Sequence, residues 1–150
     1  MADSVRQDII DAIDTRMKAI LTTGGYETNI GQNVFDWRAE PLEEDDLPAL
    51  IYRDLSVETE VVSFATFVHK MVFSIMVACA SSTPMTTIRK IIADIDKAVG
   101  VDHTWGGLAL MTERISDESG VEINERKYAG CQIVFNIIFR TLAWNDYTKI

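Results

Sequence analysis

Strict alternation of apolar side chains over residues 129–139 constrains the fold more than any other feature of this sequence. Successive side chains of a β-strand point to opposite faces of the sheet, so apolar residues at every second position form one buried face. That face consists of Ala129, Cys131, Ile133, Phe135, Ile137 and Phe139. The other face carries Gly130, Gln132, Asn136 and Arg140 among apolar residues. The pattern predicts a long strand whose sheet has one face against a core.

The segment 57–80 shows the same alternation in its second half. One face there consists of His69, Met71, Phe73, Ile75, Val77 and Cys79. We expect a long strand, with room before it for a shorter paired one. Shorter strands are also expected within 26–37, at 47–52 and at 108–115, with Pro48 at the start or on an edge of its strand. Residues 116–127 are polar enough for an exposed hairpin loop.

The first segment with helical periodicity follows Ser4. Ser4 and Gln7 form a capping-box pattern, in which the hydroxyl and the amide side chain satisfy backbone groups reciprocally. The apolar stripe consists of Val5, Ile9, Ile13, Met17 and Ile20. Gly24 and Gly25 should end this helix, because glycine readily takes the left-handed conformation.

A second helix is expected after residue 83. Thr83 is the predicted N-cap, Pro84 the first helical residue and Gly100 the end. The buried stripe consists of Met85, Ile88, Ile91, Ile92, Ile95 and Val99. The order of elements predicts an α+β fold, with a mixed or antiparallel sheet and two helices packed on one face.

Composition limits the classes of protein to consider. The chain has 150 residues, 47% of them hydrophobic, which suits a single domain over 1–150. A net charge of -9 argues against a surface that wraps nucleic acid. The N-terminus lacks a signal-peptide pattern, and the apolar stretch 71–80 is far shorter than the roughly 20 residues of a membrane helix. We therefore expect a protein made in the cytoplasm, with no membrane partner.

The sequence contains no pattern typical of a catalytic, cofactor or metal site. Two histidines are too few for a zinc motif of the HExxH type plus a further ligand cluster. His103 beside Asp102 could act as a general base, but a loop or capping pair is the favoured interpretation. His69 is expected to be structural, and Cys79 and Cys131 to be buried free thiols. We expect no enzyme activity, no cofactor and no metal.

Four further features leave their roles open. The acidic run of Glu40, Glu43, Glu44, Asp45 and Asp46 lacks the ligand spacing of an EF-hand and should form a solvated loop. Gly106 and Gly107 lack a nucleotide-binding pattern and most simply permit a turn. Asp94 and Asp96 should face different directions, which weakens a paired-carboxylate interpretation. The tryptophans Trp37, Trp105 and Trp144 could each be interface anchors or core residues.

Four segments taken together resemble the tail terminator family of long-tailed bacteriophages. They are Gly24-Gly25-Tyr26, Leu47-Pro48-Ala49-Leu50, Asp102-His103-Thr104-Trp105-Gly106-Gly107-Leu108-Ala109 and Phe139-Arg140-Thr141-Leu142-Ala143-Trp144. Their order and spacing match over nearly the whole chain. The resemblance implies a structural virion protein without catalytic activity. Such proteins form a ring, typically a hexamer, that caps the growing tail tube and presents the surface for head attachment.

The resemblance also implies partners and a location. We expect a homo-oligomeric ring that contacts the tail tube protein and a neck or head-completion protein at the head-proximal end of the virion tail. Assembly would occur in the host cytoplasm, and DNA would only pass through the ring. A neck or tail-completion protein is the nearest alternative. A small enzyme using His103 and a nearby carboxylate is the alternative from another class.

Candidate contact residues follow from these expectations. Exposed strand edges and the segment 26–37 are plausible seams between subunits, because an unpaired edge can accept a neighbour. The candidate oligomer or partner interface consists of Tyr26, Val34, Phe35, Trp37, Trp105, Gly106, Gly107, Arg140 and Trp144. The acidic loop at 40–46 is a candidate lining of the ring bore, where carboxylates would repel phosphates. Simple solubility is the alternative role of that loop.

Overall fold

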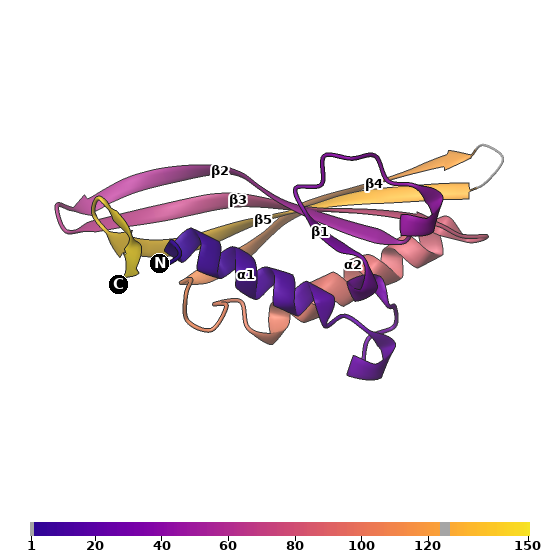
Figure 1. Cartoon of the computed structure of the whole chain (residues 1–150), viewed down its shortest axis with the longest axis horizontal. Helices are drawn as coiled ribbons and strands as arrows, with labels where there is room; N and C mark the ends of the chain where they lie inside the picture. The colour runs from indigo at the N-terminus through magenta and orange to yellow at the C-terminus, as the bar shows by residue number, and fades with distance from the viewer. Residues whose placement is uncertain (1, 124–126) are drawn as a thin grey trace.

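Two helices cover one face of a six-stranded mixed sheet, which confirms the expected α+β class (Figure 1). The computed structural model describes residues 2–123 and 127–150. The helices are α1 (Val5–Lys18) and α2 (Pro84–Val101). The strands are β1 (Val34–Asp36), β2 (Ala49–Ser63), β3 (Thr66–Ala80), β4 (Met111–Ile123), β5 (Lys127–Leu142) and β6 (Asn145–Lys149). Short 3-10 turns occupy Thr22–Gly24, Ile30–Gln32 and Glu44–Asp46.

The two strongly alternating segments lie side by side at the centre of the sheet. The strand order is β1-β2-β3-β5-β4, and β6 pairs with β5. β3 and β5 are antiparallel over their full length, from Thr66 opposite Leu142 to Ala80 opposite Tyr128. β1 is parallel to β2, and the other pairs are antiparallel. Each central strand therefore has its inward face flanked by apolar neighbours on both sides.

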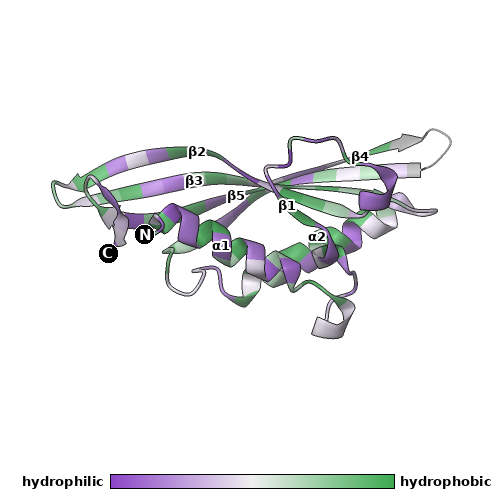
Figure 2. Ribbon diagram, in the orientation of Figure 1, coloured by the Kyte–Doolittle hydropathy of each residue, from purple (hydrophilic) through white to green (hydrophobic). Residues whose placement is uncertain are grey.

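The core lies between this inward face and the helices. The predicted inward residues of β3 and β5 are all buried, together with the predicted stripe of α1. Ile88, Ile91, Ile95 and Val99 of α2 are also buried, and Met85 and Ile92 pack partly buried against them. Apolar and polar residues alternate along the helices and the central strands (Figure 2). Removal of this apolar surface from water is the main contribution to the stability of the fold.

The first helix begins as predicted but ends earlier. Ser4 Oγ accepts from the backbone N of Gln7 at 3.1 Å, whereas the Gln7 side chain donates to Asp11 instead of returning to the cap. The expected end at the glycine pair is wrong, because α1 stops at Lys18. The chain then turns back over the helix end, where a Cβ on Gly31 would lie 2.6 Å from the Lys18 carbonyl oxygen. Only glycine fits this crossing, and the sequence pattern did not indicate it.

The second helix also differs at its ends. Pro84 is its first residue, as expected, but the Thr83 side chain makes no capping hydrogen bond. Gly100 does not end the helix, which continues to Val101. Both cysteines are buried and unpaired, as predicted. Cys79 lies opposite Ala129 and Cys131 opposite Val77, so the thiols are diagonal neighbours, and burial raises the pKa of Cys131 to about 11.

One or two short strands were expected within 26–37, and the structure has one, β1, since Ile30 instead enters a 3-10 turn that is buried against the end of α1. Two other strand predictions need correction. The segment 57–80 belongs to two strands of 15 residues each, with their turn after Ser63. The expected exposed loop at 116–127 is wrong for 116–123, which continue β4, and residues 124–126 lie outside the described residues. β6 was not expected.

Candidate functional site

Two long strand edges are open for contact with another chain. β4 pairs with β5 on one side, and nothing in the described parts of the chain pairs with its outer side. β1 covers β2 only at Leu50, Ile51 and Tyr52, so from Arg53 onward that side of β2 pairs with no strand among the described residues. Unpaired backbone groups on a strand edge can accept a neighbouring strand. The prediction of exposed edges is confirmed, although the segment 26–37 supplies only a short one.

The tip of the β2–β3 hairpin and the adjoining β5–β6 turn carry the two most exposed large apolar side chains of the described residues, Phe64 and Trp144. We call Val61, Val62, Phe64 and Trp144 the tip cluster; Phe64 is 100% exposed and Trp144 is 90% exposed. The backbone N of Ala143 donates to the Ala65 carbonyl oxygen at 3.0 Å, which joins the β5–β6 turn to the hairpin. The Trp144 ring meets Phe67 edge to face at 5.2 Å. The tip is therefore built from two turns braced against each other.

Arg140 lies near this tip on the sheet face away from the helices, which we call the open face. It pairs with Val68 and, through it, shares a row with Glu60. Its side chain is exposed and makes no ion pair with any residue in the described ranges. Two of the expected interface residues, Arg140 and Trp144, thus occupy the same end of the molecule.

Trp37 lies at the other predicted seam, beside β1. It is half exposed, its indole Nε1 donates to Asp54 Oδ1 at 2.7 Å, and the Arg53 guanidinium lies 5.5 Å from its ring. Arg6 of α1 also binds Asp54. Although burial opposes ionisation, hydrogen bonds from Trp37 and Arg6 hold the pKa of Asp54 below its ordinary value. This seam is therefore tied to α1 as well as to the sheet.

The remaining residues of the predicted seam are only partly accessible. Val34 and Phe35 of β1 are half-buried, and the Arg38 guanidinium covers the Phe35 ring at 4.5 Å. Tyr26 packs against the core, with the Lys97 ammonium 5.0 Å from its ring. Trp37 consequently offers the largest accessible apolar surface of this group. Tyr26, Val34, Phe35 and Trp37 do not lie at the same end of the sheet as the tip cluster.

Trp105 belongs to the core. It is 3% exposed, and its indole Nε1 donates to Thr112 Oγ1 at 2.8 Å, which in turn donates to the His103 carbonyl oxygen. The Arg16 guanidinium stacks 4.1 Å from the ring centre. The structure thus assigns Trp105 the packing role that the sequence left open.

The turn around Trp105 depends on a left-handed backbone and an exposed carboxylate. Trp105, Gly106 and Gly107 have φ values of 55, 74 and 83°, which confirms that the glycines permit a turn. Asp102 accepts hydrogen bonds from the Thr104 hydroxyl and from the backbone N of Gly106 and Thr104, and these lower its pKa to about 2. In the described structure no hydrogen bond joins Asp102 to His103, and the Asp102 carboxylate instead caps the turn.

Asp94 and Asp96 face different directions, as predicted. The Asp94 carboxylate is buried and accepts from the backbone N of Glu27 and Thr28 and from Thr28 Oγ1. Asp96 pairs with Arg114 at the surface. Asp94 therefore anchors the loop after α1 to α2. The sequence signal was an acidic residue inside an apolar helical stripe.

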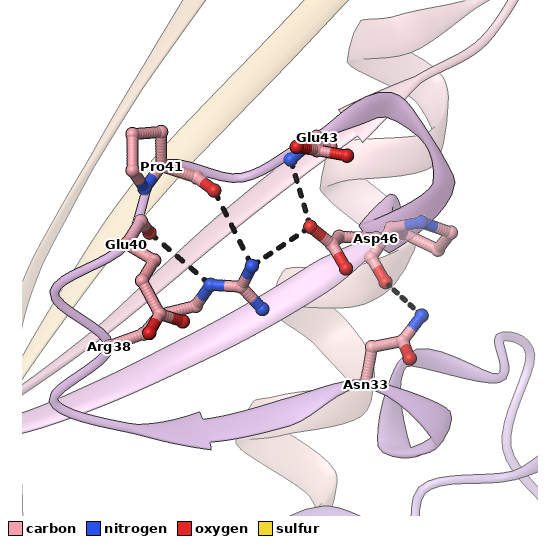
Figure 3. A network of polar contacts seen from close by, with 7 residues as sticks. Asn33, Arg38, Glu40, Pro41, Glu43 and Asp46 are labelled. Atoms are coloured by element: carbon pink, nitrogen blue, oxygen red, sulfur yellow. Dashed lines mark hydrogen bonds and ion pairs between the residues drawn. The ribbon is translucent and has the colours of Figure 1, made fainter.

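Hydrogen bonds and an ion pair between residues of the acidic loop and Arg38 hold the loop in its conformation. Arg38 donates to the carbonyl oxygens of Glu40 and Pro41 and pairs with Asp46 at 3.0 Å, and Asp46 also accepts from the backbone N of Glu43 (Figure 3). Glu40, Glu43, Glu44 and Asp45 are exposed. The expected solvated loop is thus confirmed for those four residues. Asp46 differs, because its charge is neutralised by Arg38.

His69 has the expected structural environment. It is buried, with Thr59 Oγ1 2.9 Å from Nδ1 and Thr141 Oγ1 2.9 Å from Nε2. Burial lowers the pKa of His69, against the influence of Asp146 at 3.9 Å. A cavity of about 230 Å³ adjoins the ring, beside Ser4 and Arg6. Both ring nitrogens are already engaged by threonine hydroxyls, which suits a packed polar contact across the sheet.

One acidic group was missed by the sequence analysis. Carboxylate oxygens of Asp3, Asp8 and Asp11 lie within 4.8 Å of one another at the start of α1. Asp3 and Asp11 are exposed, and Asp11 accepts a hydrogen bond from Gln7. Negative charge near a helix N-terminus is favoured by the helix dipole, which accounts for such a cluster.

The open face is hollowed at the end of the sheet opposite the tip. A shallow groove of about 610 Å³ lies there, with Met76, Ala78, Glu118, Gly120, Gly130 and Gln132 among its lining residues. Ala78, Gly130 and Gly120 are cross-strand neighbours on β3, β5 and β4. Small residues in one row leave the backbone of the sheet accessible, with the Tyr128 ring beside it. No signal of this groove was noticed in the sequence.

No protein-family model matches the chain, and no curated protein has a significantly similar sequence. Neither α1 nor α2, nor any other helix in the described ranges, is long and apolar enough to cross a membrane.

Proposed function

We propose that this chain is a tail terminator of a long-tailed bacteriophage. In this role it caps the head-proximal end of the tail tube, stops tube polymerisation and presents the surface to which the neck or head-completion protein attaches. Six copies in a closed ring would perform these tasks. The protein would be found in the virion tail after assembly in the host cytoplasm.

The open edges of the sheet are the observation that carries the proposal. Helices cover one face, while the outer edge of β4 and the distal part of β2 lie on opposite sides of the sheet without strand partners in the described ranges. Different patches on opposite sides of one subunit suit a heterologous interface, which closes into a ring if the rotation per subunit is correct. The sequence resemblance adds the identity of the assembly.

The acidic loop gains a role under this proposal. Glu40, Glu43, Glu44 and Asp45 are exposed and would face the bore, where their charge repels DNA phosphates and keeps the duplex moving. Asp46 contributes little to that field because Arg38 pairs with it. Repetition of the loop around the ring would multiply a weak interaction.

Addition of the purified protein to polymerising tail tube subunits from the same phage tests the proposal. A terminator should fix tube length at substoichiometric amounts and appear at one tube end in negative-stain images. Tubes that grow to unchanged lengths would contradict it. Binding to the connector side without an effect on tube length would instead identify a neck or tail-completion protein.

A further inference from the structure

We infer that the tip cluster of one copy docks into the open-face groove of a second copy, so that identical chains associate head to tail. The inference rests on the proposed function, because it assigns the apolar contact that holds neighbouring subunits of the proposed ring together so that their open strand edges meet. Its occupant is a second copy of this chain. The two surfaces are those defined above: Val61, Val62, Phe64 and Trp144 at the tip, and the groove around Ala78, Gly120 and Gly130.

The two surfaces lie at opposite ends of the same strands (Figure 1). β3 begins at Thr66 beside the tip and reaches Ala78 in the groove, a run of about 40 Å at roughly 3.3 Å per residue. Two arrangements can fill both patches: an antiparallel two-fold pair, in which two tips fill two grooves, and a heterologous chain of copies. The inference is the second arrangement, in which each addition leaves one free tip and one free groove and association continues until a ring closes.

The tip presents side chains typical of interface anchors. Phe64 and Trp144 are almost fully exposed, whereas aromatic side chains bury roughly 150–250 Å² each when they are packed. Trp is also enriched among residues that dominate binding energies. The contact between Trp144 and Phe67 and the hydrogen bond from Ala143 to Ala65 hold the tip in place before docking. Preorganised side chains lose less conformational entropy on binding.

The groove has room and apolar walls for the side chains of the tip cluster. Gly120 has an ordinary backbone φ, and a Cβ added there would meet no atom within 4 Å. The backbone therefore does not require glycine at this position, and its missing side chain keeps the groove open. Met76 and Tyr128 provide apolar walls, and methionine adapts its shape to a partner surface.

Charge complementarity selects a second copy as the occupant. Glu118 lies at the groove, and Arg140 lies on the same open face near the tip; both are exposed and make no ion pair with any residue in the described ranges. Near the tip, Lys70 lies opposite Glu58 on the neighbouring strand, so these two opposite charges compensate each other. Glu60 lies in the row of Arg140 but is separated from it by the intervening strand at Val68. Head-to-tail docking brings the Arg140 guanidinium of one copy toward the Glu118 carboxylate of the next.

Two variants, one for each surface, test the inference. The tip variant combines Phe64→Ser with Trp144→Gly, and glycine tolerates the φ of 63° at residue 144. The groove variant is Gly120→Leu, which fills the groove from an exposed strand position without a backbone clash. Val101→Ser removes an exposed apolar side chain at the end of α2, outside both surfaces and both strand edges, and is the matched control. Circular dichroism and thermal unfolding verify that each variant folds.

Sedimentation equilibrium at millimolar concentration gives the readout. Wild type and the control should form oligomers larger than dimers, and each surface variant alone should be monomeric. An equimolar mixture of the two variants should form dimers, because the intact tip of one variant meets the intact groove of the other. Arg140→Glu and Glu118→Arg should each weaken association at least tenfold, and their combination in one chain should restore it.

Three results would overturn the inference: a wild type that stays monomeric or stops at a dimer at this concentration, undiminished association of either folded surface variant, or a mixture that stays monomeric. The tube-length assay separates this inference from the proposed function. Head-to-tail oligomers that leave tube length unchanged would refute only the terminator role. Tube capping that survives both surface variants would refute only this contact.

Discussion

The Arg16 guanidinium of α1 lies 4.1 Å from the centre of the Trp105 ring, so the first helix is held against the turn that follows the second. Arg16 also donates to the Asp102 carbonyl oxygen. The contact joins residues far apart in the sequence and lies beneath the start of β4. It makes Trp105 a connection between both helices and the sheet.

Trp105→Ala should therefore lower the free energy of unfolding by about 3–5 kcal/mol, the usual cost of removing a large buried aromatic side chain. Trp105→Phe keeps most of the ring but loses the hydrogen bond to Thr112, and should cost about 1 kcal/mol for that bond plus a packing term. Urea unfolding measures both. Trp144→Gly is the matched control and should shift stability by no more than about 0.5 kcal/mol. Equal effects at both tryptophans would contradict the core assignment.

Asp94→Asn should destabilise the protein by about 1.5–3 kcal/mol, because three donors from residues 27 and 28 lose a charged acceptor in a buried site. Asp96→Asn removes an exposed partner of Arg114 and should cost less than about 1 kcal/mol. Chemical denaturation of the two variants gives the comparison. Hydrogen exchange should also show faster exchange at residues 26–29 in Asp94→Asn alone.

The lowered pKa of Asp102 predicts that the free energy of unfolding depends on pH in the acid range. Its pKa is lowered from 3.8 to about 2 in the folded protein. The ionised carboxylate therefore stabilises the fold at pH values above its ordinary pKa of 3.8, and this contribution is lost as the pH falls toward 2. Asp102→Asn should make the free energy of unfolding less steep between about pH 4 and 2. Thr104→Ala removes the hydroxyl donor and should have a smaller effect of the same sign. Parallel pH profiles for wild type and Asp102→Asn would exclude this role.

Neutralisation of the exposed carboxylates should slow genome ejection if the acidic loop lines the bore. The variant Glu40→Gln, Glu43→Gln, Glu44→Gln and Asp45→Asn keeps Asp46 and hence the brace to Arg38. Ejection from phage carrying this variant should be slower, with the difference decreasing as salt screens the repulsion. Arg38→Gln is the control for loop order, since it disrupts the brace and leaves those four carboxylates. Unchanged ejection would assign the loop to solubility.

Which side chains of the central strands point inward could be predicted from the sequence, because a strand with one buried face has apolar residues at every second position. Alternation at 69–79 and 129–139 and helical spacing at 5–20 and 85–99 indicated which side chains pack inward. Polar residues at 116–123 indicated a loop, yet they form the edge strand β4, because pairing with β5 supplies the backbone partners and the outer side faces water. Pairing partners are not encoded in local periodicity.

The candidate interface was predicted less completely. The sequence identified Trp37, Trp105 and Trp144 as a group, and residue type alone could not separate the buried Trp105 from the exposed Trp144. The groove could not be anticipated, since Ala78, Gly120 and Gly130 come together only through the register of three strands.

The sequence by itself determined the α+β class, the two helices and the inward faces of β3 and β5, because each depends on spacing along the chain. Only the tertiary structure decided the crossing of Gly31 over α1, the burial of Trp105 and the placement of tip and groove at opposite ends of the sheet. These features depend on contacts between distant segments, whose geometry follows from strand register and helix packing.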